Sequence, residues 1–194
     1  MSMALALEYT VDWLRDKNGW TVQQCGVQYD AIPAMDAGPF YVAVDDAGVE
    51  SGDASTDSLK EILTITIGIW RRPEHLMKDK RGILKLSTDK YLIGAYTLAE
   101  LERAVLIHNS AIPGKNGLHH NWAFVNGINA RYNLPQDQLG AGFITPLSYR
   151  GRGRMESIAI DNGSTDPAAF FGYRLRFRGL MREMKLRAAT HAVG

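Results

Sequence analysis

Small and hydrophobic residues alternate most regularly over residues 63–69, in the order Leu-Thr-Ile-Thr-Ile-Gly-Ile. Successive side chains of a β-strand point to opposite faces, so this pattern predicts a strand with one apolar face. A second strand is predicted shortly before it, at 40–44, in the run Phe-Tyr-Val-Ala-Val. Residues 45–57 lie between these strands and are acidic and rich in glycine and serine. This composition predicts a β-hairpin with a long mobile loop at its tip.

Three other segments have apolar residues at helical spacing. A short amphipathic helix is predicted over residues 4–16, before Asn18-Gly19. Thr97 and Glu100 have the spacing of a capping box, which predicts the start of a second helix that runs to about residue 110. A third helix is predicted over residues 121–132.

The C-terminal part of the chain predicts two more strands, at 143–149 and 168–177, and then a short basic tail helix at 180–189. Together with the hairpin, these elements predict an α+β fold with a single mixed or antiparallel sheet and helices packed on it. The 194 residues fit one domain, 1–194. In this domain the acidic hairpin loop is expected at about 45–57, and a basic C-terminal strand and tail at 149–194.

Arginine recurs at every second position in two C-terminal runs. In a strand over 173–178, the apolar side chains would enter a core and the arginines would share the opposite face. Guanidinium groups suit carboxylates and phosphates, so this face is a candidate surface for an acidic partner. The candidate basic interface residues are Arg150, Arg152 and Arg154 in the first run and Arg174, Arg176 and Arg178 in the second.

Charge is distributed unevenly along the chain. Residues 1–70 hold three basic and eleven acidic residues, whereas residues 71–194 hold nineteen basic and ten acidic ones. Opposite charge on two parts of a chain permits head-to-tail contacts between copies, although a match within one chain would explain the same division. The candidate acidic interface residues lie in the predicted loop and are Asp45, Asp46, Glu50, Asp53 and Asp57. The candidate aromatic anchors of such an interface are Phe40, Trp70 and Trp122.

The sequence lacks the motifs of common catalytic and phosphate-binding sites. It has no G-x-S-x-G turn and no complete phosphate-binding loop. The adjacent His119 and His120 have no nearby cysteine or H-E-x-x-H pattern, and the single Cys25 is interpreted as structural. We therefore expect no catalytic residue, no metal and no cofactor. The single cysteine cannot form an internal disulfide, which fits a protein folded in a reducing cytoplasm. The lack of a signal-like start and of a long apolar run predicts no signal peptide and no membrane partner.

The order of elements, together with several segments, resembles the tail-terminator (tail-completion) proteins of tailed bacteriophages. The segments are Gly38-Pro-Phe-Tyr-Val-Ala-Val, Leu63-Thr-Ile-Thr-Ile-Gly-Ile-Trp-Arg-Arg-Pro, Phe143-Ile-Thr-Pro-Leu-Ser-Tyr and Phe171-Gly-Tyr-Arg-Leu-Arg-Phe. The resemblance implies a virion protein of the tail and neck that forms a hexameric ring, with no cofactor and no catalysis. Such a ring caps the tail tube, contacts the tail tube protein and the head–tail connector or stopper, and lets DNA pass without sequence-specific binding.

Two other classes of function remain open from the sequence. In a nucleic-acid-binding module, Arg150, Arg152 and Arg154 would contact phosphates, and Tyr149 or Tyr173 would stack on bases. A small enzyme of unrecognised type is the third class.

Overall fold

A computed structural model describes residues 3–27, 40–54, 58–71, 76–78, 84–86, 98–107, 117–131, 142–160 and 168–184. Its helices are α1 (Met3–Asn18), α2 (Leu98–Leu106) and α3 (Trp122–Arg131). Its strands are β1 (Cys25–Val27), β2 (Phe40–Ala54), β3 (Ser58–Arg71), β4 (Leu76–Lys78), β5 (Leu84–Leu86), β6 (Gly142–Phe143), β7 (Ser148–Arg152), β8 (Glu156–Ile160) and β9 (Ala168–Met184).

One mixed sheet dominates the fold. The long strands β2, β3 and β9 lie side by side and antiparallel, and β1 adds to β2 in parallel. The short strands β6, β7 and β8 pair one after another along the other edge of β9. The predicted α+β fold with a single mixed sheet is therefore confirmed, while β4 and β5 pair with each other in a separate hairpin.

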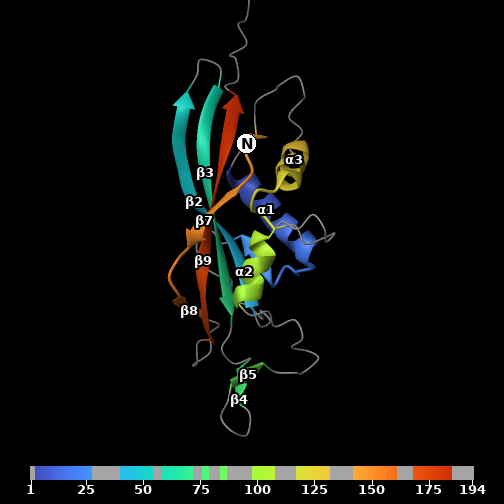
Figure 1. The fold of residues 1–194 in the computed structure, drawn as a ribbon, viewed down its shortest axis with the longest axis vertical. Helices are drawn as coiled ribbons and strands as arrows, with labels where there is room; N and C mark the ends of the chain where they lie inside the picture. The colour runs from blue at the N-terminus through green and yellow to red at the C-terminus, as the bar shows by residue number, and fades with distance from the viewer. Residues whose placement is uncertain are drawn as a thin grey trace, which may run out of the picture.

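The three helices lie on one side of the long strands (Figure 1). The residues of β3 that alternate as predicted, from Leu63 to Ile69, point their apolar side chains at these helices and are fully buried. They share one core with Tyr173, Leu175 and Phe177 of β9 and with the apolar sides of α1, α2 and α3. We call this the inner face of the sheet and the opposite side its outer face.

The predicted mobile loop at 45–57 is wrong for most of its length. Residues 45–54 continue β2 and pair with β3 as far as Leu59, so only residues 55–57 fall outside the described part of the chain. One extra residue, Ala47, is accommodated in a β-bulge between Asp46 and Gly48, where Gly48 has φ 110°. The glycine and the acids therefore mark a bulge in a strand, and the long regular partner β3 keeps that strand paired.

The C-terminal strands also differ from the prediction. The expected strand at 143–149 is two short strands, β6 and β7, interrupted at residues 144–147. The last strand runs on to Met184, so the expected tail helix at 180–189 is wrong as far as residue 184 and otherwise lies outside the described residues. Alternation through residues 173–178 continues in Gly179 and Met181, both of which are buried, and this keeps the strand extended.

The helices agree more closely with the sequence. The predicted helices at 4–16 and 121–132 are confirmed in α1 and α3, and α2 ends at Leu106, earlier than expected. Thr97 of the predicted capping box lies outside the described residues. Of the candidate aromatic anchors, Phe40 and Trp70 are fully buried, whereas Trp122 is 56% exposed.

Candidate functional site

A charged hollow of about 660 Å³ lies on the outer face of the sheet. Its lining brings together seven of the eleven residues that the sequence marks as interface candidates. Four are arginines and three are acids, and two threonines of β3 lie between them. The seven are Asp45, Asp46, Glu50, Arg150, Arg174, Arg176 and Arg178.

The small outer-face residues of β3 allow the acids of β2 to reach the arginines of β9. Thr64, Thr66 and Gly68 lie directly opposite Arg178, Arg176 and Arg174 in the pairing of β3 with β9. On the other edge of β3, Thr66 pairs with Asp45 and Thr64 with Gly48. Long side chains of β2 and β9 can therefore meet over the outer face of β3, because β3 has no large side chain at these positions to separate them.

Two arginines of the hollow form ion pairs within the chain. Arg174 lies 3.6 Å from a carboxylate oxygen of Asp45 and 3.6 Å from one of Glu156, and Arg178 contacts the carboxylate of Glu50. Asp45 and Glu50 therefore both form ion pairs within their own chain, and their use as acids for a neighbouring copy stays a prediction. Part of the charge division along the sequence is an intramolecular match.

Two other arginines of the hollow remain unpaired. Arg150 and Arg176 are exposed and form no ion pair with any residue that the structure describes. The arginines at 174 and 178 are both partly exposed, with 37% and 35% of their side chains accessible, so the hollow stays open to solvent. It therefore offers two free guanidinium groups between two that are already held by carboxylates.

The bulge at Ala47 decides which acids reach the outer face. Asp45 lies opposite the outer-face Thr66, and beyond the bulge Glu50 lies opposite Ile62. Without the extra residue, Asp45 and Glu50 would alternate onto different faces, because five positions separate them. The carboxylate of Asp46 accepts a hydrogen bond from the N–H of Gly48 (2.6 Å), which stabilises the bulge.

A second bulge, at Gly151, separates the arginines of the upstream run. Tyr149 lies opposite Phe177, and three positions later Arg152 lies opposite Leu175, so β7 holds one residue more than β9 between these pairs. Gly151 has φ 111°, a conformation that favours glycine. As a result Arg150 enters the outer hollow, while Arg152 turns to the inner face.

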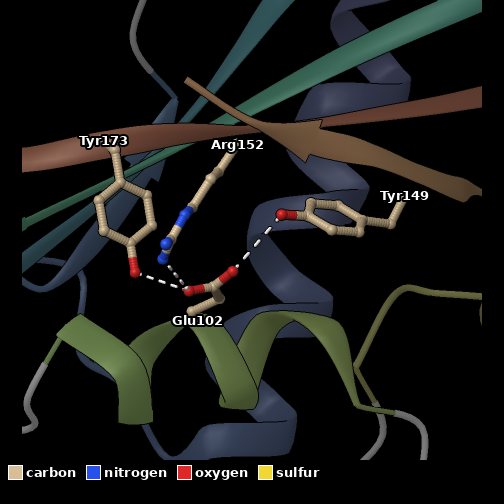
Figure 2. A network of polar contacts seen from close by, with 4 residues as sticks. All are labelled: Glu102, Tyr149, Arg152 and Tyr173. Atoms are coloured by element: carbon tan, nitrogen blue, oxygen red, sulfur yellow. Dashed lines mark hydrogen bonds and ion pairs between the residues drawn. The ribbon is translucent and has the colours of Figure 1, made fainter. Parts of the chain in front are cut away.

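Arg152 joins a polar network on the inner face that centres on Glu102 of α2 (Figure 2). The hydroxyl of Tyr173 donates to the Glu102 carboxylate at 2.6 Å, the hydroxyl of Tyr149 donates at 3.4 Å, and Arg152 lies 3.5 Å away. The Arg152 guanidinium also lies over the Tyr173 ring, 5.2 Å from its centroid. The network connects α2 to β7 and β9 through one carboxylate.

The network changes the acid–base properties of both tyrosines. Burial, followed by the hydrogen bond to Glu102, raises the pKa of Tyr173 to about 12. Burial and the nearby Glu102 charge also raise the pKa of Tyr149. Both phenols therefore remain protonated donors at neutral pH, which suits a structural contact.

This geometry corrects the predicted nucleic-acid site. Tyr149 and Tyr173 point toward α2 and their hydroxyls bind Glu102, so neither ring is presented as a platform for a base (Figure 2). The run Arg150, Arg152 and Arg154 is not one row, because only Arg150 lines the hollow. Arg154 is exposed outside the hollow, and the predicted interface positions Asp53 and Asp57 have no described side chain.

His119 and Cys25 have local structural roles. His119 accepts a hydrogen bond from the Tyr149 N–H on its Nδ1 (3.0 Å), and the His119 and His120 rings lie 4.1 Å apart. In the described part of the chain, no cluster of three or more metal-binding side chains includes them. Cys25 is fully buried and burial raises the pKa of its thiol to about 12, which confirms its structural interpretation.

Sequence reasoning missed Glu102, which holds the inner network, and Glu156, which pairs with Arg174. Neither has a local signal, because each meets its partners only through the fold. Comparison with models of known protein families finds no match, and a search of curated proteins finds no relative. Among the described helices, none is long and apolar enough to span a membrane.

Proposed function

We propose that this protein is a structural subunit of a ring, of the kind that caps the tail tube of a tailed bacteriophage and joins it to the neck. The observation that carries the proposal is that the two faces of the sheet differ. Helices cover its inner face (Figure 1). Its outer face holds an open charged hollow with two arginines that form no ion pair with a described residue. A subunit with two different surfaces on opposite sides suits head-to-tail contacts, and such a contact forms a ring when it closes.

The element order supports the same proposal. The resemblance implies a short N-terminal helix, a hairpin with a long tip, a central helix and two final strands. The described part of the chain has an N-terminal helix, a β-hairpin, two central helices and then strands β6 to β9. In this role six copies surround the path of DNA, and the ring contacts the tail tube protein and the head–tail connector. The protein needs no cofactor and performs no catalysis there.

Binding to nucleic acid is less well supported by the hollow. Three carboxylates line it together with the arginines, and a polyanion would be repelled by them. Binding to nucleic acid usually depends on several phosphate contacts. Among the described residues, only two arginines of the hollow are free of ion pairs.

Native mass spectrometry over a range of protein concentrations, with electron microscopy of the same samples, tests the proposal. We expect closed assemblies with a single stoichiometry at high concentration and low salt. A dimer in which the same surface meets itself would contradict the head-to-tail arrangement. A chain that stays monomeric and binds duplex DNA with a steep salt dependence would favour a nucleic-acid-binding module instead.

A further inference from the structure

An acidic stripe on α1 lies on the other side of the molecule from the hollow. Its three carboxylates are spaced four residues apart, so they share one side of the helix. The apolar side of α1 enters the core on the inner face of the sheet, and the stripe is turned away from it. The stripe consists of Glu8, Asp12 and Asp16, and the core-facing residues include Leu7, Val11 and Leu14.

The stripe has one free carboxylate and two that are paired at the surface. Glu8 is exposed and forms no ion pair with any described residue. Asp12 lies 2.6 Å from Arg131, and Asp16 lies 2.8 Å from Lys17. The Asp12 and Asp16 side chains are 46% and 72% exposed, and pairs this exposed contribute little and exchange readily.

The stripe and the hollow are complementary but cannot meet within one chain. The hollow offers the free guanidinium groups of Arg150 and Arg176, and the stripe offers the free carboxylate of Glu8. The sheet and its core lie between them, because α1 packs on the inner face and the hollow opens on the outer face. Only a second copy of the chain can bring the two surfaces together.

We propose that the α1 stripe of one copy binds in the outer-face hollow of the next, with Glu8 against Arg150 and Arg176. The inference rests on the proposed ring and identifies its contact. Isolated carboxylates on a helix can insert between the acids of the hollow, which a continuous row of phosphates cannot do without repulsion. Because the two surfaces differ, the contact is head-to-tail and can repeat from copy to copy.

An exposed aromatic residue on α3, the helix next to α1, can supply apolar contact area. Trp122 begins α3, which packs beside α1 through the rings of Tyr9 and Phe124, whose centroids are 5.3 Å apart. Trp122 is therefore on the helix-covered side of the sheet, as the stripe is. Aromatic residues commonly dominate the affinity of an interface, while the charges around them set register and partner choice.

Charge reversal tests the contact. We expect Glu8→Arg alone and Arg176→Glu alone each to weaken association roughly tenfold or more, since each places like charges together. Both side chains are exposed, so melting should stay unchanged. Arg154→Glu is the matched control: it makes the same charge change on an exposed arginine outside the hollow, and association should remain near that of the original chain.

Mixing the two defective variants gives the decisive observation. In an alternating assembly every contact of a Glu8→Arg copy with an Arg176→Glu copy regains opposite charges. Native mass spectrometry should therefore find mixed assemblies that contain equal numbers of the two variants. These should form at a protein concentration at which neither variant assembles alone. Association that survives both single reversals, or a mixture that does not recover, would overturn the inference.

Disulfide trapping separates this inference from the ring itself. The double variant Glu8→Cys with Arg176→Cys should give a ladder of cross-linked oligomers under mild oxidation, since the buried Cys25 is protected. Glu8→Cys with Arg154→Cys should give no ladder beyond dimers. A ladder without closed rings would support the contact and refute the proposed ring. Rings that form in the original chain without a ladder in the double variant would refute the contact alone.

Discussion

Phe177 is the residue that most directly tests the inner face. Its side chain is fully buried in the core, next to the ring of Tyr149 at 5.7 Å between centroids. We expect Phe177→Ala to lower the free energy of unfolding by about 3–5 kcal/mol, because it removes a large side chain and leaves a cavity. Chemical denaturation measures the loss. A change below about 1 kcal/mol would mean that the ring is not packed as described.

Tyr173 and Tyr149 offer a matched pair for the Glu102 network. Both hydroxyls donate to the same carboxylate, but at 2.6 Å and 3.4 Å. A hydrogen bond to a charged group contributes about 1.5–3 kcal/mol, so Tyr173→Phe should be destabilising in this range. Tyr149→Phe should cost less, because its bond is long. Equal losses in denaturation experiments on the two variants would argue against a network centred on Tyr173 and Glu102.

The same tyrosine predicts how stability depends on alkaline pH. The pKa of Tyr173 is raised by burial, and then by its bond to Glu102, from 10.0 to about 12. Folding therefore favours the protonated phenol, and its contribution is complete below pH 10 and is lost as the pH rises toward 12. Ultraviolet titration of tyrosinate should show more than one late-ionising group, because burial also raises the pKa of Tyr41 to about 12. One of these groups should be missing from Tyr173→Phe. If both proteins titrate alike, the Tyr173 environment is not as described.

At the scale of elements, the two bulges are the features that place the charges. We expect Gly151→Ala to destabilise the protein by about 1–3 kcal/mol, because φ 111° strains a residue with a side chain even though the space there is open. Gly153→Ala is the control two positions along, where an added Cβ would meet only ordinary contacts at 3.6 Å or more. Thermal melting of the two variants, compared with the original chain, measures the difference. Similar melting temperatures would show that the bulge does not need glycine.

The same two bulges explain which parts of the fold could be predicted from sequence. The alternation over 63–69 and 173–178 predicts both strands and their buried faces, since the hydrophobic period survives in each. A bulge adds one residue and reverses the alternation after it, so Glu50 and Arg152 end on faces that a regular strand would not give them. The glycines at 48 and 151 were the only local signals, and they are equally typical of loops.

At the scale of the whole molecule, some of the opposite charges pair within the chain and others remain available to partners. The sequence predicted that acids of the first half and arginines of the second belong together. It could not predict whether they meet within one chain, because that depends on the strand order β2–β3–β9. This order puts β3 between the acids of β2 and the arginines of β9, and the outer-face residues of β3 opposite the arginines are small. The same order allows Glu50 to pair with Arg178. The arginines left over at 150 and 176 form the part that remains for assembly.

A charge swap between Glu50 and Arg178 tests that division. Their pair is exposed, with 63% of the Glu50 side chain and 35% of the Arg178 side chain accessible, so solvent screening limits its contribution to about 0–1 kcal/mol. Arg178→Glu should lower stability slightly by placing two carboxylates together, and adding Glu50→Arg should restore it. A double-mutant cycle from denaturation curves isolates the coupling between the two side chains.

Arg176→Glu provides the comparison within the same row, because Arg176 lies next along the outer face and has no ion pair among the described residues. Its reversal should leave stability nearly unchanged and should affect association instead. A different result would be that Arg178→Glu leaves stability unchanged and that adding Glu50→Arg restores assembly alone. The pair would then act between copies, and the charge division would be intermolecular. Coupling in the denaturation cycle, present in the monomer, would instead establish that this pair stabilises the individual subunit and leaves Arg150 and Arg176 for its neighbour.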